Sequence, residues 1–451
     1  MKKPLIQRRG CREAQKNQRG VTLALMAASI VAMLAMAALS IDVASLYTAN
    51  CEAQRAADAA ALAGARWLSI SGMTGDPTNN ASQWVNACNQ AKQIAMEAAI
   101  QNSVAGSNLT VANVPTLSVL DRGGNGCGTS GPVALGVNPQ VTVVVQVPNI
   151  RLFFAPVMRA FFSPGAARTL TVSATATAEA YNPSNGVNFT PSGLQVPVQP
   201  RCVKPWIVPN LDPVTSNPFI SPTGTINNPG ISTAGGGVVG EQFSLVADCG
   251  GGATCTLTSN PPGQTGIALQ YVPALINGSV VAVPSTAAGN PYQEASAGCD
   301  AATQYNCGTP SGAQADLTVN PSGPAGYTSV AVQALINQGV GEDTLSTAVY
   351  PYEFEAGAGN PLVSKGAASQ GEILSSSNNV VTVPVMDSTN PISTGTTQPN
   401  VTILGFLQLF VRNVNTANGR LRVTVLNVAA CGTATGSAIG GTTPVPVRLV
   451  Q

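Results

Sequence analysis

The cysteines are the residues whose type and spacing offer chemistry in this sequence. There are 10 Cys and no His among 451 residues, so neither a His-dependent nucleophile system nor a His-ligated metal site is possible. Cysteine thiols in an oxidising compartment favour disulfides. Cys249 and Cys255 have five residues between them, and Cys299 and Cys307 have seven. Both spacings predict small loop-closing disulfides, each contributing about 2–3 kcal/mol by the chain-entropy relation.

The remaining cysteines are assigned by elimination, because connectivity does not follow from sequence alone. Two pairs then remain in the chain after the apolar span: Cys88 with Cys127, and Cys202 with Cys431. Cys11 precedes an apolar span and is expected to stay reduced. Cys51 is then the odd residue, either facing another subunit or packing as a small helix residue without a special role.

Other candidate chemistry is weak. Four carboxylates lie within 14 residues, and they suit either weak calcium binding or ordinary solvated loops; these are Glu342, Asp343, Glu353 and Glu355. The glycines of 235–240 match GxGxxG in letters, but no strand leads into them and no helix pattern follows, so a flexible loop is favoured. We therefore predict no catalytic residues, no cofactor and no metal site, and a protein that is not an enzyme.

The charge distribution is uneven. Charged residues are 9% of the chain, against roughly 25% in an ordinary soluble domain. Residues 1–20 hold seven Lys/Arg and one acid, for a net charge of +6, and the other 431 residues carry −5. The main body has no basic face of the kind that nucleic-acid binding requires, so we predict no nucleic-acid partner.

The basic tail precedes one long apolar stretch. Val21–Ile41 contains 21 residues without a charge, Pro or Gly, enough to cross roughly 30 Å of hydrocarbon as a helix. The positive-inside rule places residues 1–20 in the cytoplasm and the chain after Asp42 outside. A cleaved signal peptide is the alternative, because Ala35-Met36-Ala37 fits a small-x-small cleavage site.

The residues after the span predict that the helix continues. Asp42–Leu68 has no Pro, and eight of the thirteen residues from Ala53 to Ala65 are Ala, the best helix former. Val21–Trp67 is therefore expected to form one rod of 47 residues, roughly 70 Å long at 1.5 Å per residue. Small alanine side chains would let another helix approach closely.

The segment Arg19–Trp67 resembles the amino-terminal segment of the TadE/TadG-like Flp pilus-assembly family. That family has a basic residue and Gly, an apolar span, an Asp, a Tyr, and then a Gln- and Ala-rich run. In this sequence the pattern falls on Arg19, Gly20, Val21–Ile41, Asp42, Tyr47, Gln54, Ala57, Asp58, Ala61, Leu62 and Gly64. The resemblance implies an inner-membrane or pseudopilin-like part in the tight-adherence pilus system.

Two further features bear on this resemblance. Prepilin-type processing cuts after a Gly that precedes an apolar helix, as at Gly20-Val21, but the fifth mature residue, usually Glu in pilins, is Leu25 here. Cleavage at that bond is thus left open. Weaker similarities to longer family members occur at Val141–Phe162, at Thr169–Ala180 and at Cys202-Val203-Lys204-Pro205-Trp206.

The rest of the chain reads as α+β and then mostly β. Gln83–Gln101 has helical spacing, and the best strand patterns are Leu109–Leu120, Pro139–Val147, Thr169–Ala180, Ser279–Val283, Ser329–Leu335, Asn379–Val385, Val401–Val411 and Arg420–Val428. We expect an α+β fold with a transmembrane helix continuing into an Ala-rich pilin-like rod, a small antiparallel sheet and a β-rich extracytoplasmic domain whose strand-turn rhythm suits a sandwich. The predicted divisions are 1–20 (tail), 21–41 (span), 42–70 (stalk), 71–182 (pilin-like unit), 183–200 (linker) and 201–451 (β-rich domain).

The functional prediction follows from the anchor. We expect a single-pass inner-membrane protein, with its N-terminus in the cytoplasm and its bulk periplasmic or extracellular, that is a structural or assembly component of a Flp-type pilus apparatus. Its expected partners are the lipid bilayer and either other pilus-assembly membrane proteins or like subunits through the N-terminal helix. The alternative is a surface-exposed or secreted adhesive or ligand-binding protein that shares only the anchor.

Overall fold

The computed structural model gives a chain in two compact units. It describes residues 10–72, 74, 81–121, 124–128, 139–152, 154, 169–180, 182, 198–222, 224, 226–228, 230–232, 236–308, 311–322, 326–348, 352–374, 376–431, 439–441 and 445–450. The first unit comprises Met1–Ala57, Ala99–Pro115 and Val144–Thr175, and the second comprises Asp58–Ala98, Thr116–Val143 and Ala176–Gln451. The boundary therefore runs through two helices and two strands.

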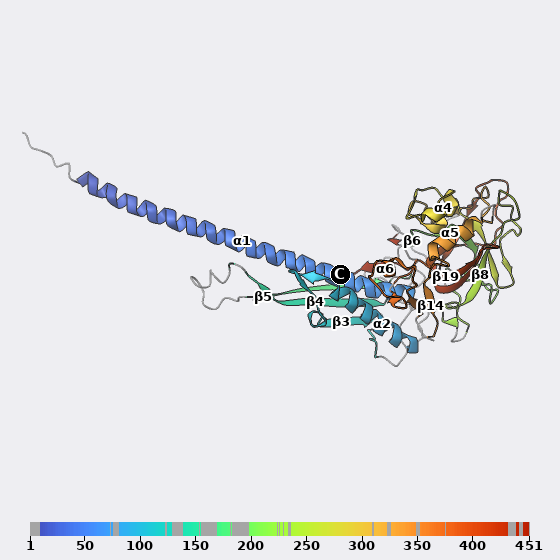
Figure 1. Ribbon diagram of the computed structural model, residues 1–451, viewed down its shortest axis with the longest axis horizontal. Helices are drawn as coiled ribbons and strands as arrows, with labels where there is room; N and C mark the ends of the chain where they lie inside the picture. The colour runs from blue at the N-terminus through green and yellow to red at the C-terminus, as the bar shows by residue number, and fades with distance from the viewer. Residues whose placement is uncertain are drawn as a thin grey trace, which may run out of the picture. The chain divides into compact units, whose positions relative to one another are not determined.

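The helix α1 (Gly10–Ile70) is one uninterrupted element of 61 residues (Figure 1). The predicted continuity of span and stalk is confirmed, and the helix extends beyond both expected ends. The part of α1 from Val21 to Ile70 is apolar and long enough to cross a membrane. The 18 residues of this part that are most apolar are not buried by other described residues. The absence of helix breakers and the run of alanines explain why the backbone continues unbroken beyond Asp42.

The segments after α1 are short helices and strands. The helix α2 (Ala81–Ile100) confirms the helical spacing expected there. The next elements are β1 (Ser103–Val104), β2 (Ser107–Asn108), the 3-10 helix η1 (Val111–Asn113), β3 (Thr116–Leu120), β4 (Gln140–Arg151) and β5 (Thr169–Ala180). Strands β3, β4 and β5 form a four-stranded sheet together with β22 (Val447–Leu449), in the order β22-β5-β4-β3. A strand from the end of the chain thus completes the small sheet, which the sequence did not predict.

The second unit holds the remaining elements. They are β6 (Val198–Pro200), β7 (Trp206–Pro209), β8 (Gln242–Ala247), β9 (Gln264–Thr265), β10 (Ala268–Pro273), β11 (Val280–Val281), η4 (Ser285–Ala287), α4 (Pro291–Ala297), β12 (Cys299–Asp300), β13 (Ala313–Gln314), α5 (Tyr327–Ile336), β14 (Thr344–Ser346), β15 (Glu353–Glu355), α6 (Pro361–Ser364), β16 (Ile373–Leu374), β17 (Val380–Met386), β18 (Asn400–Val401), β19 (Ile403–Asn415), β20 (Arg420–Ala430) and β21 (Ile439–Gly441). The α+β class is confirmed. The expected linker 183–200 lies outside the described residues except for β6.

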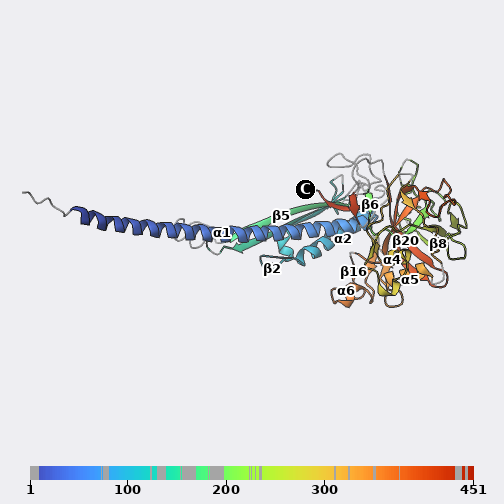
Figure 2. The same ribbon diagram turned by 90° about the horizontal axis from the view of Figure 1, so that it is seen from above.

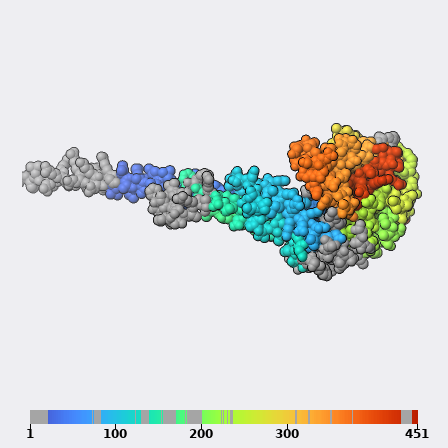
Figure 3. Space-filling model, turned by 60° about the horizontal axis from the view of Figure 1, so that its bottom comes forward, coloured from blue at the N-terminus to red at the C-terminus, as the bar shows by residue number. Residues whose placement is uncertain are grey.

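The largest sheet closes on itself as a barrel. Its strand order is β7-β17-β19-β20-β8-β10-β9, and β7 also pairs with β10, which closes a ring of the first six of these strands. In the space-filling view, the orange and red surface of the last part of the chain borders the green surface of residues beyond about 200 (Figure 3). The two pairings β10–β8 and β17–β7 are parallel. The sandwich expectation is therefore wrong for this sheet. Parallel neighbours need crossover connections, and a strand-turn rhythm in the sequence does not reveal those connections.

Alternate residues of the barrel strands share one hydrophobic cluster. It takes Trp206 and Val208 from β7, Leu407 and Leu409 from β19, and corresponding residues from the other four strands. A second cluster contains residues of opposite parity, such as Ile207 and Phe406. Strand β19 is thus buried on both faces, as its continuous apolar run predicted.

One predicted strand is a helix. Residues 327–336 form α5, although Ser329–Leu335 alternates like a strand. The buried side chains Thr328, Ser329, Ala331, Val332 and Ile336 follow a helical rather than a twofold period, and Ala, Gln and Leu favour helix. α5 lies beside α4 in both views (Figures 1 and 2), and small buried residues from α4 and α5 pack together.

Asp212 and Glu241 are buried acids that lie close together in the second unit. They are 5% and 4% exposed. The Asp212 carboxylate accepts hydrogen bonds from the backbone N of Val214 and the hydroxyl of Thr215. Burial, the charge of Asp212 and a hydrogen bond to Asp212 raise the pKa of Glu241 to about 8. Glu241 therefore stays protonated near neutral pH and shares its proton with Asp212.

We expect Glu241 to make the stability of this unit fall with rising pH. The unfolded chain releases this proton near pH 4.5 but the folded chain keeps it until about pH 8, so the unfolding free energy drops across that window. Glu241→Gln removes the charge and keeps a hydrogen-bond donor. Its unfolding free energy at pH 8 should therefore be about 2 kcal/mol higher than that of the wild type. Urea denaturation between pH 5 and 8 measures this difference. The exposed control Glu372→Gln should follow the wild type, and an identical pH slope in Glu241→Gln would contradict the assignment.

Candidate functional site: the membrane span and stalk helix

Beyond the span, α1 presents one buried face and one outer face. The buried positions Ala49, Ala53, Ala56, Ala57, Ala60, Ala61, Ala65, Trp67 and Leu68 are at most 1% exposed. They recur every three or four residues, the period of one helix face. In the span itself the large apolar side chains are exposed, from Val21 at 61% to Ile41 at 50%. The helix thus changes at Asp42 from an apolar surface on all sides to a one-sided packing surface.

Asp42 marks this change and is itself 3% exposed. Its two carboxylate oxygens accept hydrogen bonds from the backbone N of Phe154, at 3.2 and 3.0 Å. The carboxylate therefore fixes the chain that follows β4 against the first turn beyond the span. Asp42 stands alone as a charged residue between Arg19 and Glu52, which was the signal for a structural role.

The next motif positions have different surroundings. Tyr47 is 72% exposed, and the Gln54 side-chain amide donates to the carbonyl of Thr175 on β5 at 3.2 Å. Glu52, which the sequence pattern did not single out, accepts from the backbone N of Ala105 at 2.7 Å and so holds the β1–β2 turn. Ala105 and Gly106 have left-handed φ angles of 50° and 75°, which a turn between two short strands requires.

The remaining motif positions lie in the alanine run, where α1 belongs to the second unit. Ala61 is fully buried, while Asp58 and Leu62 are half-buried on the other face. A Cβ at Gly64 would lie 3.0 Å from the carbonyl O of Ala91 on α2 and 3.0 Å from Val141 on β4. Gly64 is therefore a point of close approach between α1, α2 and β4. Gly20 and Val21 lie within α1, so cleavage between them stays a prediction.

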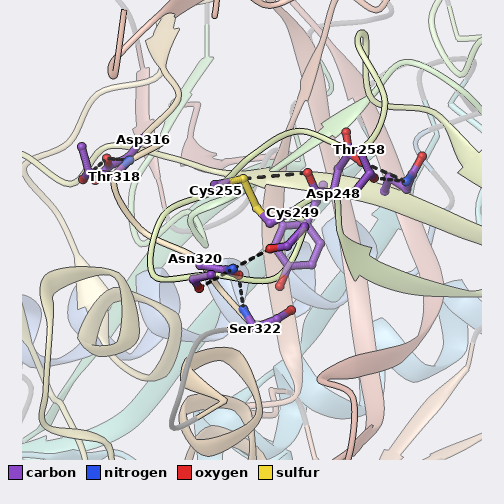
Figure 4. The surroundings of a disulfide bond; sticks show 12 residues. Asp248, Cys249, Cys255, Thr258, Asp316, Thr318, Asn320 and Ser322 are labelled. Atoms are coloured by element: carbon purple, nitrogen blue, oxygen red, sulfur yellow. Dashed lines mark hydrogen bonds between the residues drawn. A yellow bond between two sulfur atoms is a disulfide. The ribbon is translucent and has the colours of Figure 1, made fainter.

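Eight of the predicted disulfide cysteines form four disulfides. Cys88–Cys127 and Cys249–Cys255 are paired as predicted. Figure 4 shows the second of these, with Asn320 beside the disulfide. The side-chain amide of Asn320 donates to the carbonyls of Gly250 and Gly252 in the enclosed loop. Among the described residues Cys51 is a free cysteine, half-buried on α1.

The other two predicted pairs are wrong. The disulfides are Cys202–Cys299 and Cys307–Cys431. The backbone N of Cys202 donates to the carbonyl of Asp300, which sets Cys202 beside Cys299. The backbone of Cys307 pairs with that of Ile403 in an isolated β-bridge, and the backbone N of Cys431 donates to the carbonyl of Leu404. Both cysteines therefore lie at the start of β19. These two disulfides are therefore determined by segments that are adjacent in the fold but far apart in sequence, and short spacing in sequence did not predict them.

The Cys-x-x-Pro-Trp element fastens the end of α4. Cys202 is disulfide-bonded to Cys299, the ammonium of Lys204 donates to the carbonyl of Gly298 at 2.7 Å, and the indole N–H of Trp206 donates to Ser296 at 3.2 Å. Every second residue of the element thus contacts the segment 296–299. Burial lowers the pKa of Lys204 to about 7. The element is a structural clamp of the second unit.

The four loop carboxylates do not form a metal site among the described residues. Asp343 is buried and accepts from the backbone N of Gly357, the amide of Asn360 and the hydroxyl of Ser377. Glu353 accepts from the side-chain amide of Gln90. These groups hold neighbouring segments together. The GxGxxG letters at 235–240 begin outside the described residues.

An apolar helical segment that continues unbroken into an alanine-packed stalk is long and apolar enough to cross a membrane. Residues 20–66 match the Tad family model, which describes TadE/G-like Flp pilus-assembly proteins. The match confirms the resemblance predicted for Arg19–Trp67 and identifies this segment as TadE/G-like. No curated protein and no solved structure matches the chain significantly.

Proposed function

We propose that the chain is a structural or assembly component of a Flp-type pilus apparatus, anchored in the inner membrane by α1. Residues 1–20 lie in the cytoplasm, and the chain beyond Asp42 lies outside it. The protein acts through helix packing and surface contacts with like subunits or other pilus-assembly membrane proteins, without catalysis or a bound cofactor.

The observation that carries this proposal is the TadE/G-like helix itself. Its match ends at residue 66, where the alanine face is fully buried against the protein's own α2 and β4. The apolar side chains of residues 21–41 are exposed in the part of the chain that the structure describes, and such a surface suits hydrocarbon. The excess of basic residues before the span supports the orientation.

Cys51 and Cys11, which lie on opposite sides of residues 21–41 in the sequence, give a direct test of this orientation. In intact cells with a permeabilised outer membrane, a membrane-impermeant maleimide should label Cys51 and leave Cys11 unlabelled. Disruption of the inner membrane should then make Cys11 reactive. The variants Cys51→Ser and Cys11→Ser assign each signal, and the product is sequenced from its amino terminus. Labelling of Cys11 in intact cells would contradict the proposed orientation.

The same experiment separates the alternatives for the span. Retention of residues 21–41 in the membrane fraction supports the anchored protein, and an amino terminus at Val21 makes it a processed subunit able to enter a filament. A soluble chain that begins beyond Ala37 would remove the anchor and favour the secreted adhesive alternative. Deletion of the gene should abolish pilus formation if the assembly role is correct. Surface binding that is lost while pili persist would favour the adhesive.

A further inference from the structure

The stretch of α1 that is almost free of charge is longer than residues 21–41. Among the 32 residues from 20 to 51, only Asp42 carries a charge. As part of α1 these residues span roughly 48 Å at 1.5 Å per residue. The hydrocarbon core of a bilayer is roughly 30 Å thick, and the bilayer with its headgroup layers is roughly 40–45 Å thick. The stretch between Arg19 and Glu52 therefore matches the whole bilayer and not only its hydrocarbon core.

Asp42 does not interrupt this surface, because its carboxylate is covered. The residue is 3% exposed, and both carboxylate oxygens accept hydrogen bonds from the backbone N of Phe154. A hydrogen bond to an ionised group is stronger than one between neutral groups. An exposed carboxylate at the edge of the hydrocarbon core would be costly, whereas one that is covered and hydrogen-bonded can lie there. The charge at position 42 thus does not fix the end of the surface that faces the membrane.

Large apolar side chains stay exposed beyond Asp42. Val43 is 56% exposed, Tyr47 is 72% exposed, and Phe154, which follows β4, is 37% exposed. The buried alanine face of α1 begins only at Ala49. Tyr47 lies six residues beyond the predicted span, or roughly 9 Å along the helix, which is comparable with the thickness of one headgroup layer. Tyrosine is enriched at this depth, because its ring is apolar and its hydroxyl can reach water.

We propose that the outer boundary of the membrane lies at the level of Tyr47, and that Val43, Tyr47 and Phe154 contact the headgroups and the upper acyl chains of the lipid. This inference rests on the proposed anchoring of α1 and adds to it a lipid contact made by the chain after β4. All three residues belong to the first unit. Their side chains continue the exposed apolar surface of residues 21–41, and the carboxylate between them is covered, so lipid is favoured over a second protein as their partner.

Two separate lipid contacts restrict how the first unit tilts. A single helix that leaves the bilayer can tilt over a wide range, and its tilt is set by interfacial anchors. Here one anchor lies on α1 itself, and the other is Phe154, which is 112 residues after Asp42 in the chain. The hydrogen bonds between Asp42 and Phe154 hold the two anchors together. Asp42 is therefore the positioning residue of the second anchor.

The fluorescence of an introduced tryptophan measures the depth of each side chain. The full-length chain is reconstituted into vesicles of phosphatidylethanolamine and phosphatidylglycerol that carry bromine on the upper or the lower part of the acyl chains, and iodide is the quencher in water. The three native tryptophans are buried and give a constant background. Tyr47→Trp and Phe154→Trp should be quenched by the upper bromines and shielded from iodide. Val31→Trp, in the middle of the span, should be quenched by the lower bromines, and the exposed control Val340→Trp of the second unit should respond to iodide alone.

The controls separate this inference from the anchoring itself. If Val31→Trp is quenched by lipid while Tyr47→Trp and Phe154→Trp respond to iodide like Val340→Trp, the inference is overturned and the anchor stands. If lipid does not quench Val31→Trp, the proposed anchoring fails as well. Shielding of Tyr47→Trp and Phe154→Trp from both quenchers would assign these side chains to a contact with a second protein, and would also overturn the inference.

Replacement of Asp42 tests its positioning role. In the Phe154→Trp chain, the further change Asp42→Ala should lower quenching by the upper bromines severalfold and raise quenching by iodide, because the carboxylate no longer holds the chain after β4. In the Tyr47→Trp chain the same change should leave lipid quenching in place, since Tyr47 lies on α1 itself. An unchanged signal from Phe154→Trp would overturn the role assigned to Asp42.

Discussion

We expect the double replacement Cys307→Ser/Cys431→Ser to lower the unfolding free energy of the second unit by about 5 kcal/mol, by the chain-entropy relation. The bridge joins residues 124 apart in sequence, so it restricts the unfolded chain more than any short loop closure could. The enclosed segment contains α5 and the barrel strands β17, β19 and β20. Urea denaturation of the full-length chain measures the loss, with free thiols blocked so that the disulfides do not exchange.

Peptide mapping gives the control for this prediction. Proteolysis without reduction should yield peptides joining Cys202 to Cys299 and Cys307 to Cys431. The variant Cys51→Ser should unfold like the wild type, because Cys51 is free. Recovery of a peptide that joins Cys299 directly to Cys307, or an unchanged stability of the double variant, would refute the observed pairing.

Replacement of Gly64 by leucine should be the most damaging single change in the stalk. Even a Cβ at this position would lie 3.0 Å from the backbone oxygen of Ala91, and that oxygen belongs to a helix and cannot rotate away. The larger side chain forces α1 apart from α2 and β4, so we expect a loss of about 3 kcal/mol from overpacking. Gly64→Ala should be nearly neutral by comparison, since its tight contact is offset by about 1 kcal/mol of gained helix propensity.

The matched control is Ala59→Leu, an exposed position on the same helix. It adds the same side chain to the same element without a neighbouring backbone, and should leave the thermal unfolding midpoint unchanged. Limited proteolysis should cut the stalk of Gly64→Leu faster than that of Ala59→Leu. Equal effects of the two substitutions would show that close packing at Gly64 does not limit the side chain at this position.

The sequence by itself determined the elements that depend on local patterns. The uncharged run Val21–Ile41 and the alanines that follow were enough to predict one long helix, because span length and helix propensity are properties of neighbouring residues. β5 occupies the predicted residues Thr169–Ala180, and β19 confirms the buried apolar strand. Cys249–Cys255 was predictable for the same reason, since five intervening residues leave little freedom. Alternation over only seven residues was insufficient at α5, where helix and strand patterns overlap.

The tertiary structure alone decided which distant segments meet. The barrel closes through the β7–β10 pairing, Cys307 reaches Cys431 beside the start of β19, and Asp42 binds Phe154 across 112 residues. The free-energy cost of closing a long loop rises only slowly with its length, so spacing in sequence carries little information about such pairs. They are selected by the packing and hydrogen bonding of the strands that bring them together.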